Sequence, residues 1–350
     1  MEEMRAVFFK EKGDVDKLIF GNFPRPSCSR GEVLVRVLAT SVNHLDITTR
    51  DGTARVEFPL PHIPGCDAAG IVEEVGEDVS MFSRGEKVVL NPGISCGKCS
   101  MCRRGMESVC TDFTIVGEHR NGAYAEYIAV PERNLMRLPP SYPFIKAAAA
   151  PLVYLTAWHA LVSRAHISFG ERILVSGGSG GVSTAAIQIA KLFDAHVATT
   201  TRSEEKVQKL AQIGADEVLI SKENWSKDYL AKGNDGFDLI IDSTGSSQWR
   251  EHLRLLRKGG RIVNYGITSG GHVELELAHI FWKQQSIIGS TMGDYADFET
   301  VMKLVFSGKL EPVVDRVFAL RDAAAAQSYV SSARQVGKVV IVNGESEISV

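Results

Sequence analysis

The stretch ERILVSGGSGGVSTAAIQIAKLF, residues 171–193, decides the fold of half of this chain. Its apolar start, residues 173–175, predicts a short buried strand, and residues 182–193 predict a helix. Between them, residues 177–181 form a turn almost without side chains. A strand, a glycine turn and a helix start together place unpaired backbone N–H groups where they bind a pyrophosphate. The glycine spacing departs from G-x-G-x-x-G, and Ser183 takes the third fingerprint position.

The residues after this helix repeat the alternation of strand and helix. AHVATTTRSEEKVQKLAQIGADEVLI (195–220) predicts a strand, an amphipathic helix and a third strand. FDLIIDSTG (237–245) and GGRIVNYGIT (259–268) each predict a further strand that ends in small or polar residues. The chain is therefore α/β, with a doubly wound parallel sheet, and a dinucleotide should lie across the carboxyl ends of its strands. The predicted cofactor-binding residues are Gly177, Gly178, Ser179, Gly180, Gly181, Val182, Thr201, Arg202, Ser203, Thr244 and Gly266.

The end of the second strand bears on the choice of cofactor. Sites for NAD usually offer Asp or Glu there to the ribose 2′-hydroxyl, whereas an Arg accommodates the 2′-phosphate of NADP. Here the sequence reads Thr199-Thr200-Thr201-Arg202-Ser203, with no acid before Glu204. We therefore predict NADPH in preference to NADH. The alternative is that Arg202 is a solvated turn residue and that Glu204 binds the ribose.

Four cysteines stand in NPGISCGKCSMCRRGMESVC, residues 91–110, with the spacing C-x2-C-x2-C-x7-C. Four thiolates make a closed tetrahedral set, which is typical of one structural zinc rather than a catalytic one. An iron–sulfur cluster also accepts four cysteines, and two disulfides would require an oxidising compartment. We predict zinc, with the following ligands: Cys96, Cys99, Cys102 and Cys110.

Length and charge limit the remaining possibilities. A chain of 350 residues exceeds the usual size of one hydrophobic core, so two domains are expected. A formal charge of -3 without a basic run gives no reason to expect nucleic acid, and small molecules are the expected partners. No stretch approaches the ~20 apolar residues of a membrane helix, and the charged start lacks the pattern of a signal peptide. We expect a cytoplasmic protein in which Cys28 and Cys66 are free thiols.

Almost the whole chain resembles the medium-chain dehydrogenase/reductase superfamily, which includes zinc alcohol dehydrogenases and quinone oxidoreductases. The resemblance implies a GroES-like β-barrel domain, an inserted Rossmann domain, a C-terminal segment that returns to the first domain, and an active site in the cleft between them. It rests on the cysteine and cofactor motifs and on GEVLVRVLATSVNHLDITTRDG (31–52), PHIPGCDAAGIVEEVGEDV (61–79), GAYAEYIAVPERNLMRLP (122–139), AAAAPLVYLTAWHAL (147–161) and the final GKVVIV.

The first half of the chain independently reads as β-rich. The β-branched residues Val33, Val35 and Val37 recur at every second position, and glycine or proline turns return every ~8 to 15 residues. The sequence LPPSYPF then interrupts regular structure before an alanine-rich helix. We expect these segments: a catalytic domain over 1–145 with the zinc lobe at 91–112, a nucleotide-binding domain over 146–290, and a returning segment over 291–350.

The chain departs from the alcohol dehydrogenases where their catalytic zinc binds. The positions that match the three family ligands are Asn43, Cys66 and Leu152, of which only Cys66 is a plausible ligand. A catalytic zinc needs three protein donors and one open position. A rearranged set of Cys66, Asp67 and His44 remains as an alternative, although adjacent residues rarely reach one metal together.

Without that Lewis acid, an alcohol lacks the group that would stabilise its alkoxide. The segment SVNHLD is similar to that of the family members without catalytic metal, the quinone oxidoreductases and enoyl reductases. We therefore predict hydride transfer from NADPH to a quinone or an α,β-unsaturated carbonyl. The candidate catalytic residues are Asn43, Asp46, Tyr154 and Thr156, and His44 and Lys338 are further candidates for cofactor contact. Asp46 is as readily explained by fixing a turn, and Tyr154 and Thr156 by helix packing.

Two other functions remain open. One is a zinc alcohol dehydrogenase with rearranged ligands, and the other is a nicotinamide-binding protein without turnover. The segment QQSIIGSTMG (284–293) reads as an exposed apolar edge strand, and such edges often pair across a two-fold axis. We expect a homodimer or homotetramer.

Overall fold

The computed structural model describes residues 2–344, and the chain forms two compact units. The first unit contains Met1–Val153 and Asp294–Val350, and the second contains Tyr154–Gly293. The chain therefore leaves the first unit once and returns to it. The boundaries expected from the sequence follow residues 145 and 290, and those of the compact units follow residues 153 and 293.

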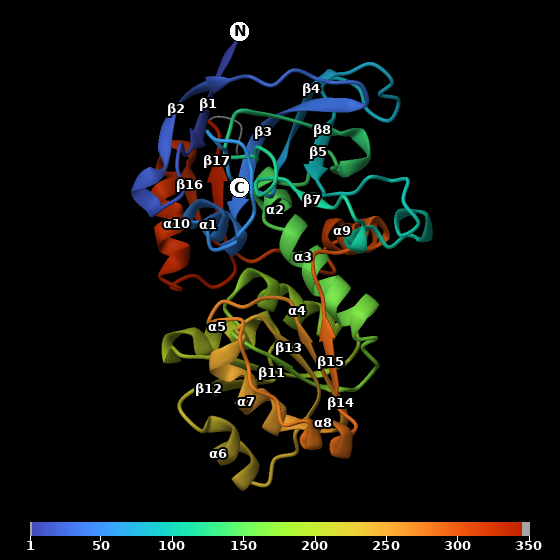
Figure 1. The fold of residues 1–350 in the computed structure, drawn as a ribbon, viewed down its shortest axis with the longest axis vertical. Helices are drawn as coiled ribbons and strands as arrows, with labels where there is room; N and C mark the ends of the chain where they lie inside the picture. The colour runs from blue at the N-terminus through green and yellow to red at the C-terminus, as the bar shows by residue number, and fades with distance from the viewer. Residues whose placement is uncertain (1, 345–350) are drawn as a thin grey trace. The chain divides into compact units, whose positions relative to one another are not determined.

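The second unit is built on a six-stranded sheet in which every neighbouring pair is parallel. The strand order is β12-β11-β10-β13-β14-β15, and Figure 1 labels each of these strands except β10. This order confirms the predicted doubly wound sheet. The strands are β10 (Arg172–Val175), β11 (His196–Thr201), β12 (Glu217–Ile220), β13 (Phe237–Asp242), β14 (Leu256–Asn264) and β15 (Ser286–Gly289).

A helix lies in each connection between consecutive strands, as parallel pairing requires. The apolar strand residues Leu174, Ile240 and Ile262 pack with Trp225 and Trp249 of two of these helices in one buried cluster. The helices of this unit are α4 (Gly181–Lys191), α5 (Val207–Ile213), α6 (Trp225–Ala231), α7 (Ser246–Leu255) and α8 (Leu277–Lys283).

The strand order reverses between β10 and β13. From β10 the chain moves outward through β11 to β12, and then crosses back to β13 on the other side of β10. Ligands of open α/β sheets bind outside the carboxyl ends of the strands at such a reversal. The glycine turn directly follows β10, so the fold places it at the expected cofactor position.

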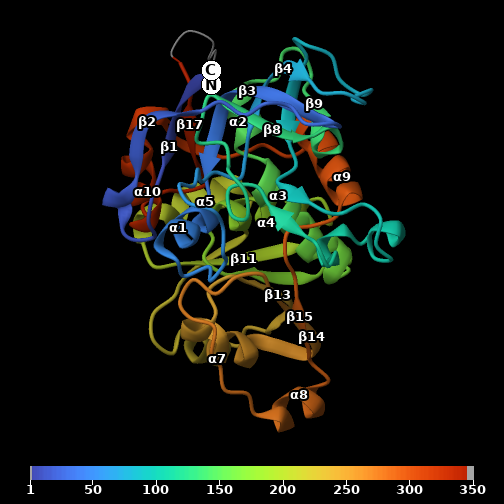
Figure 2. The ribbon, with the colours of Figure 1, turned by 45° about the horizontal axis from the view of Figure 1, so that its top comes forward.

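The first unit is built on a seven-stranded, largely antiparallel sheet. Its order is β16-β17-β3-β4-β5-β9, with β8 also paired to β3. Figures 1 and 2 both show β17, near the end of the described chain, beside β3 from its beginning. The strands are β3 (Glu32–Val42), β4 (Ala69–Val75), β5 (Lys87–Leu90), β8 (Tyr127–Pro131), β9 (Leu135–Arg137), β16 (Val314–Ala319) and β17 (Lys338–Val342).

Shorter elements complete the first unit. Val33, Val35 and Val37, the alternating residues of β3, all contribute to one hydrophobic core. Among the helices of residues 2–344, none combines the length and apolar character needed to cross a bilayer. The other elements are β1 (Glu3–Phe8), β2 (Ile19–Pro24), β6 (Gly93–Ile94), β7 (Thr114–Ile115), α1 (His44–Asp51), α2 (Phe144–Ala148), α3 (Pro151–Trp158, which continues into the second unit), α9 (Tyr295–Phe306) and α10 (Ala323–Ser331).

Candidate functional site

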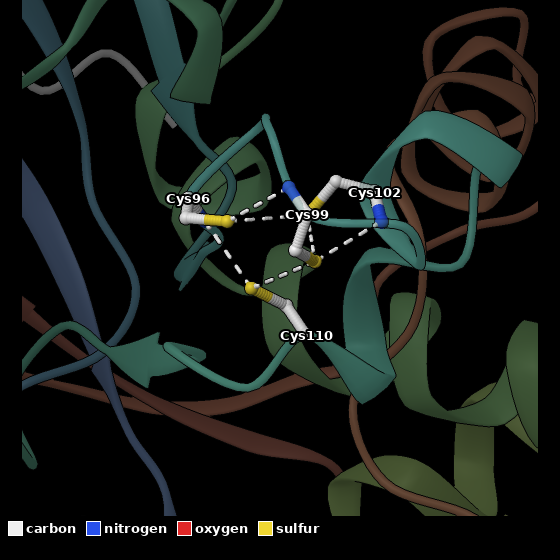
Figure 3. Close-up of side chains that lie close together, drawn as sticks. All are labelled: Cys96, Cys99, Cys102 and Cys110. Carbon is white, nitrogen blue, oxygen red and sulfur yellow. Dashed lines mark hydrogen bonds between the residues drawn. The ribbon is translucent and has the colours of Figure 1, made fainter.

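The four cysteines of the lobe converge on one point. Their Sγ atoms all lie within 4.8 Å of one another, as Figure 3 illustrates. Cys102 opens a short 3-10 helix, and Cys110 follows another, Glu107–Val109, so two tight turns bring the second pair of sulfurs toward Cys96 and Cys99. Among the described residues no disulfide forms between cysteines.

The distances between these sulfurs fit a zinc ion. A tetrahedron with Zn–S bonds of about 2.3 Å has S···S distances of about 3.8 Å. The structure has 3.9 Å from Cys96 to Cys102, 3.5 Å from Cys99 to Cys102 and 3.8 Å from Cys99 to Cys110. Backbone N–H groups also donate to the sulfurs, and that of Cys102 lowers the pKa of the Cys99 thiol to about 6. The cluster can therefore bind a structural zinc with the four predicted residues.

The cysteine lobe holds the start of α9. The backbone N–H of Ser108 donates to Asp294 Oδ1 at 2.7 Å, and the N–H of Tyr295 donates to Glu107 Oε2 at 3.4 Å. Asp294 is the N-cap of α9, and Ser108 lies two residues before Cys110. A metal bound by Cys110 would thus stabilise the place where the chain re-enters the first unit.

In the second unit, the glycine turn is pressed against β11. The N–H groups of Gly177 and Gly178 donate to Thr200 Oγ1 at 2.9 Å and to the Thr200 carbonyl at 2.8 Å. A Cβ atom on Gly178 would lie 2.2 Å from Thr199 Oγ1, so no larger residue fits there. The turn leads into α4, whose N-cap is Gly180. This close packing leaves the first N–H groups of α4 available for a phosphate.

The polar turn after β11 contains two cations. Thr201 is buried and its hydroxyl accepts the N–H of Ser203 at 3.2 Å, which fixes the turn, while Arg202 is exposed. Lys206, which is not among the predicted residues, donates from Nζ to Ser179 Oγ at 3.2 Å. Lys206 thus contacts the glycine turn from the segment that follows the second strand. In the sequence, its position four residues after Arg202 is the feature that could have identified Lys206 as a second cation near the cofactor.

The ends of β13 and β14 are fixed by one buried carboxylate. Asp242 is fully buried and accepts the N–H groups of Thr244 and Gly245, each at 3.1 Å, and Asn264 Nδ2 at 3.0 Å. The Thr244 hydroxyl lies 2.9 Å from the hydroxyl of Ser176, which directly precedes the glycine turn. Asn264 also donates to the Gly266 carbonyl at 2.8 Å. Thr244 and Gly266, two of the predicted residues, therefore belong to one hydrogen-bonded edge at the ends of β10, β13 and β14.

In the first unit, Asn43 and Asp46 begin α1. Asn43 is the N-cap, and its N–H donates to Asp46 Oδ2 at 2.8 Å, an arrangement of the capping-box type. The Asn43 side chain is buried and hydrogen-bonded at both ends, since Nδ2 donates to Asp67 Oδ2 at 2.8 Å and Oδ1 accepts Lys338 Nζ. His44, the next residue, is exposed. Asn43 thus joins the helix start to a buried ion pair.

That ion pair is Asp67 with Lys338. Lys338 Nζ lies 3.3 Å from Asp67 Oδ2 and also donates to the Val42 carbonyl at 3.0 Å. The carboxylate accepts further hydrogen bonds from the Ser41 hydroxyl at 2.6 Å and from the Leu152 N–H at 2.8 Å. Both charged side chains are buried. The contacts of Lys338 lie within the first unit, and its predicted role in cofactor binding remains a prediction.

Asp46 is the centre of a second buried group. The Cys66 thiol donates to Asp46 Oδ1 at 3.1 Å, and the Tyr124 hydroxyl donates to Oδ2 at 3.1 Å. Burial raises the pKa of the Asp46 carboxyl to about 6 and raises that of the Cys66 thiol above its usual range. Nearby Glu118, also buried, has its pKa raised to about 7 by burial and then by the charge of Asp46. Tyr124 and Glu118 are not among the residues predicted from the sequence.

The other two candidate catalytic residues, Tyr154 and Thr156, lie on α3 in the second unit, and both are buried. The Thr156 hydroxyl has no hydrogen-bond partner among the described residues. The catalytic roles predicted for Tyr154 and Thr156 remain predictions. Packing alone would not require a hydroxyl at position 156.

The possible zinc ligands around Cys66 are held in hydrogen bonds within the chain. Within residues 2–344, no three converging His, Cys, Asp or Glu ligands include Cys66, Asp67 or His44. Both oxygens of Asp67 are occupied by donors from the chain, and the Cys66 thiol retains its proton in the hydrogen bond to Asp46. A catalytic zinc needs three protein donors, so these hydrogen bonds would have to break before Cys66, Asp67 and His44 could bind one.

Known proteins match the chain over nearly its whole length. The family model described as alcohol dehydrogenase GroES-like domain matches residues 29–140, and the model described as zinc-binding dehydrogenase matches residues 181–307. A quinone oxidoreductase of Lama guanicoe is 32% identical over 97% of this chain and 97% of its own. An acryloyl-coenzyme A reductase of Sulfurisphaera tokodaii is 31% identical over 91% of this chain and 94% of its own.

Solved structures agree with these relatives. The crystal structure of an NAD-dependent alcohol dehydrogenase is 40% identical, has a TM-score of 0.93, and is matched over 97% of this chain and 100% of that one. The GroES-like and nucleotide-binding folds expected from the sequence are thereby confirmed. The chain belongs to the medium-chain dehydrogenase/reductase superfamily, and it is an NAD(P)H-dependent oxidoreductase.

Proposed function

We propose that this oxidoreductase reduces a quinone or an α,β-unsaturated carbonyl with NADPH and uses no catalytic zinc. The proposal rests on the residues found at the three positions where the family's alcohol dehydrogenases bind that metal. They hold Asn43, Cys66 and Leu152, and only Cys66 offers a ligand atom. Asn43 instead joins the Asp67–Lys338 ion pair, and Cys66 is hydrogen-bonded to Asp46.

This arrangement suits the reduction of an activated acceptor. Bound NADPH supplies a hydride, and an electron-poor double bond accepts it without a metal that polarises an alcohol. The chain must then bind the acceptor, exclude water and deliver one proton. The curated relatives named quinone oxidoreductase and acryloyl-coenzyme A reductase act on acceptors of these two kinds, as their names state.

The preference for NADPH has separate support. No acid stands between the end of β11 and Glu204, whereas Arg202 and Lys206 offer two cations to a 2′-phosphate. The solved alcohol dehydrogenase that is 40% identical is described as NAD-dependent, so its own cofactor is NAD rather than NADP. The ratio of kcat/KM for NADPH to that for NADH decides the question, and comparable values would refute the preference.

A zinc-dependent alcohol dehydrogenase is the second candidate. It is favoured by the 40% identity to a solved alcohol dehydrogenase. The two functions differ in a direct assay, because the first predicts NADPH oxidation with quinones or enones and the second predicts alcohol oxidation that a chelator abolishes. Tight NADPH binding without turnover on any acceptor would instead indicate a binding protein.

We further propose that the protein forms a homodimer through the edge of the second unit's sheet. β15 is the last strand of that sheet, with Ile287 41% exposed. On neighbouring α8, Leu277, Phe281 and Trp282 are 70%, 69% and 76% exposed. A free strand edge next to large exposed apolar side chains favours a second copy of the chain as the partner.

A further inference from the structure

The buried polar group of the first unit holds more carboxyls than cations. Three carboxyl groups, Asp46, Asp67 and Glu118, are buried there, and the ammonium of Lys338 is paired with Asp67. Arg50, one turn further along α1, donates instead to Gln327 and to the Gly13 carbonyl. Burial, and then the negative charge of Asp46, raise the pKa of the Glu118 carboxyl to about 7, so its acid form persists to near neutral pH.

The backbone places Glu118 beside Cys66. Gly117, the preceding residue, packs directly on Gly65, because a Cβ atom at position 117 would lie 2.5 Å from the Gly65 carbonyl oxygen. His62 Nε2 also lies 3.1 Å from the Gly117 carbonyl oxygen. The turn that carries Glu118 is therefore fixed against the segment that carries Cys66, at the position that matches the catalytic metal of the alcohol dehydrogenases.

The neighbour of Glu118 favours its acid form. His119 Nδ1 lies 3.2 Å from Glu118 Oε2 and accepts the Ile115 N–H at 3.2 Å, so this nitrogen carries no proton that it could donate to the carboxylate. Burial lowers the pKa of the His119 imidazole, which keeps the ring neutral. An acceptor nitrogen beside a carboxylate oxygen gives it no hydrogen bond and does not stabilise its negative charge. The contact therefore disfavours the carboxylate form of Glu118.

Glu118 is also the more accessible carboxyl of the pair. Its side chain keeps 8% of its exposure, while that of Asp46 is fully buried. Its pKa of about 7 suits a general acid near neutral pH. The proposed reduction requires such an acid, and neither Asn43 nor Lys338 is free to act as one, since both are held in the pairing with Asp67.

We propose that Glu118 is the catalytic general acid of the reduction, a role that rests on the proposed function. Hydride forms the C–H bond at the β-carbon of the enone, and the electron pair of the double bond moves to the α-carbon and carbonyl. The Glu118 O–H bond breaks as its proton forms the new bond to the α-carbon, or to oxygen when the acceptor is a quinone. The resulting carboxylate regains a proton from water, with Asp46 as the second carboxyl of the pair.

The variant Glu118→Gln tests this role, because glutamine has the shape of the protonated acid but carries no labile proton of this kind. With NADPH and an enone, kcat should fall by about 10² to 10⁴, the usual contribution of a general acid, while KM for NADPH stays unchanged. The matched control Glu77→Gln removes an exposed glutamate and should leave kcat unchanged. Zinc content and Tm confirm that both variants are folded.

The pH profile separates a proton donor from a structural residue. In the wild type, kcat should fall as pH rises through about 7, because the acid form is required, and in Glu118→Gln this limb should disappear. In D2O the wild type should place deuterium on one face of the α-carbon, and the variant should lose that selectivity. The titratable groups that face Glu118 or its partner Asp46 are His119, Cys66, Tyr124, Asp67 and Lys338.

The outcomes are distinct. If the wild type reduces enones and Glu118→Gln does so equally fast with the same pH limb, Glu118 is not the acid, although the proposed function stands. If the wild type reduces no quinone or enone, the proposed function fails and the role of Glu118 fails with it.

Discussion

Lys338 and Asp67, 271 residues apart in the chain, form a buried ion pair with 3.3 Å between Nζ and Oδ2. The pair joins β17, in the segment that returns to the first unit, to the residues just before β4. It also fixes Asn43 and, through Asp67, the N–H of Leu152. The last described strand, β17, thus supplies the lysine that holds Asp67 and Asn43 in place.

Replacing Lys338 with methionine should destabilise the first unit by about 3–5 kcal/mol, because Asp67 is then buried without its cation. The double variant Lys338→Met/Asp67→Asn should recover part of that loss, since no charge remains unpaired. Thermal and urea unfolding measure both. The control Lys303→Met breaks an exposed pair with Glu299 and should cost no more than about 0.5 kcal/mol. Equal effects of the two single variants would contradict the account.

Glu118→Gln should change the pH dependence of stability in a defined direction. Folding raises the pKa of the Glu118 carboxyl from 4.5 to about 7, so the folded state loses stability as pH rises across that range. Glu118→Gln has no carboxyl at this position, so its stability does not fall for this reason as pH rises. Its Tm should equal that of the wild type near pH 4.5 and exceed it by a few degrees at pH 8. A Tm difference that does not grow between these two pH values would show that the carboxyl titrates normally.

The double variant Arg202→Ala/Lys206→Ala should raise KM for NADPH at least about 10-fold, because each charge-assisted hydrogen bond to a phosphate contributes about 1.5–3 kcal/mol. KM for NADH should hardly change, since NADH lacks the 2′-phosphate. Lys222→Ala, at an exposed lysine beyond β12, is the control and should alter neither value. A parallel rise for both cofactors would place the two cations elsewhere than at the 2′-phosphate.

Light scattering at micromolar concentration should show a dimer, and Ile287→Lys/Trp282→Glu should convert it to a monomer. The two changes put charge on the β15 edge and on α8. Phe169 is 77% exposed in the second unit but outside these elements, so Phe169→Glu is a matched control that should remain dimeric. A monomeric wild type would reject the interface.

Local signals explain which parts could be predicted from sequence. The glycine turn and the four cysteines each lie within about 20 residues of chain, so short-range geometry nearly determines how they meet. The alternation in β3 and the six parallel strands follow from apolar periodicity. The structure brings these residues together as the sequence predicts.

Long-range pairing explains what the sequence did not reveal. Asp67 and Lys338 meet only because β17 pairs with β3, and no spacing rule links their positions. The pKa of the Glu118 carboxyl is raised by burial and by the charge of Asp46. Glu118 lies on a turn whose placement depends on the close contact of Gly117 with Gly65. Lys206 lies in a charged stretch of the sequence, but its contact with Ser179 could be identified only from the folded structure.

Reduction without a catalytic metal predicts a definite zinc content per chain. Elemental mass spectrometry on purified wild type should give one zinc per chain, and Cys110→Ser should lose it while Cys28→Ser, at a thiol outside the lobe, keeps it. Two zinc ions per chain in the wild type, with one retained in Cys110→Ser and required for alcohol oxidation, would refute metal-free reduction and establish a rebuilt catalytic site.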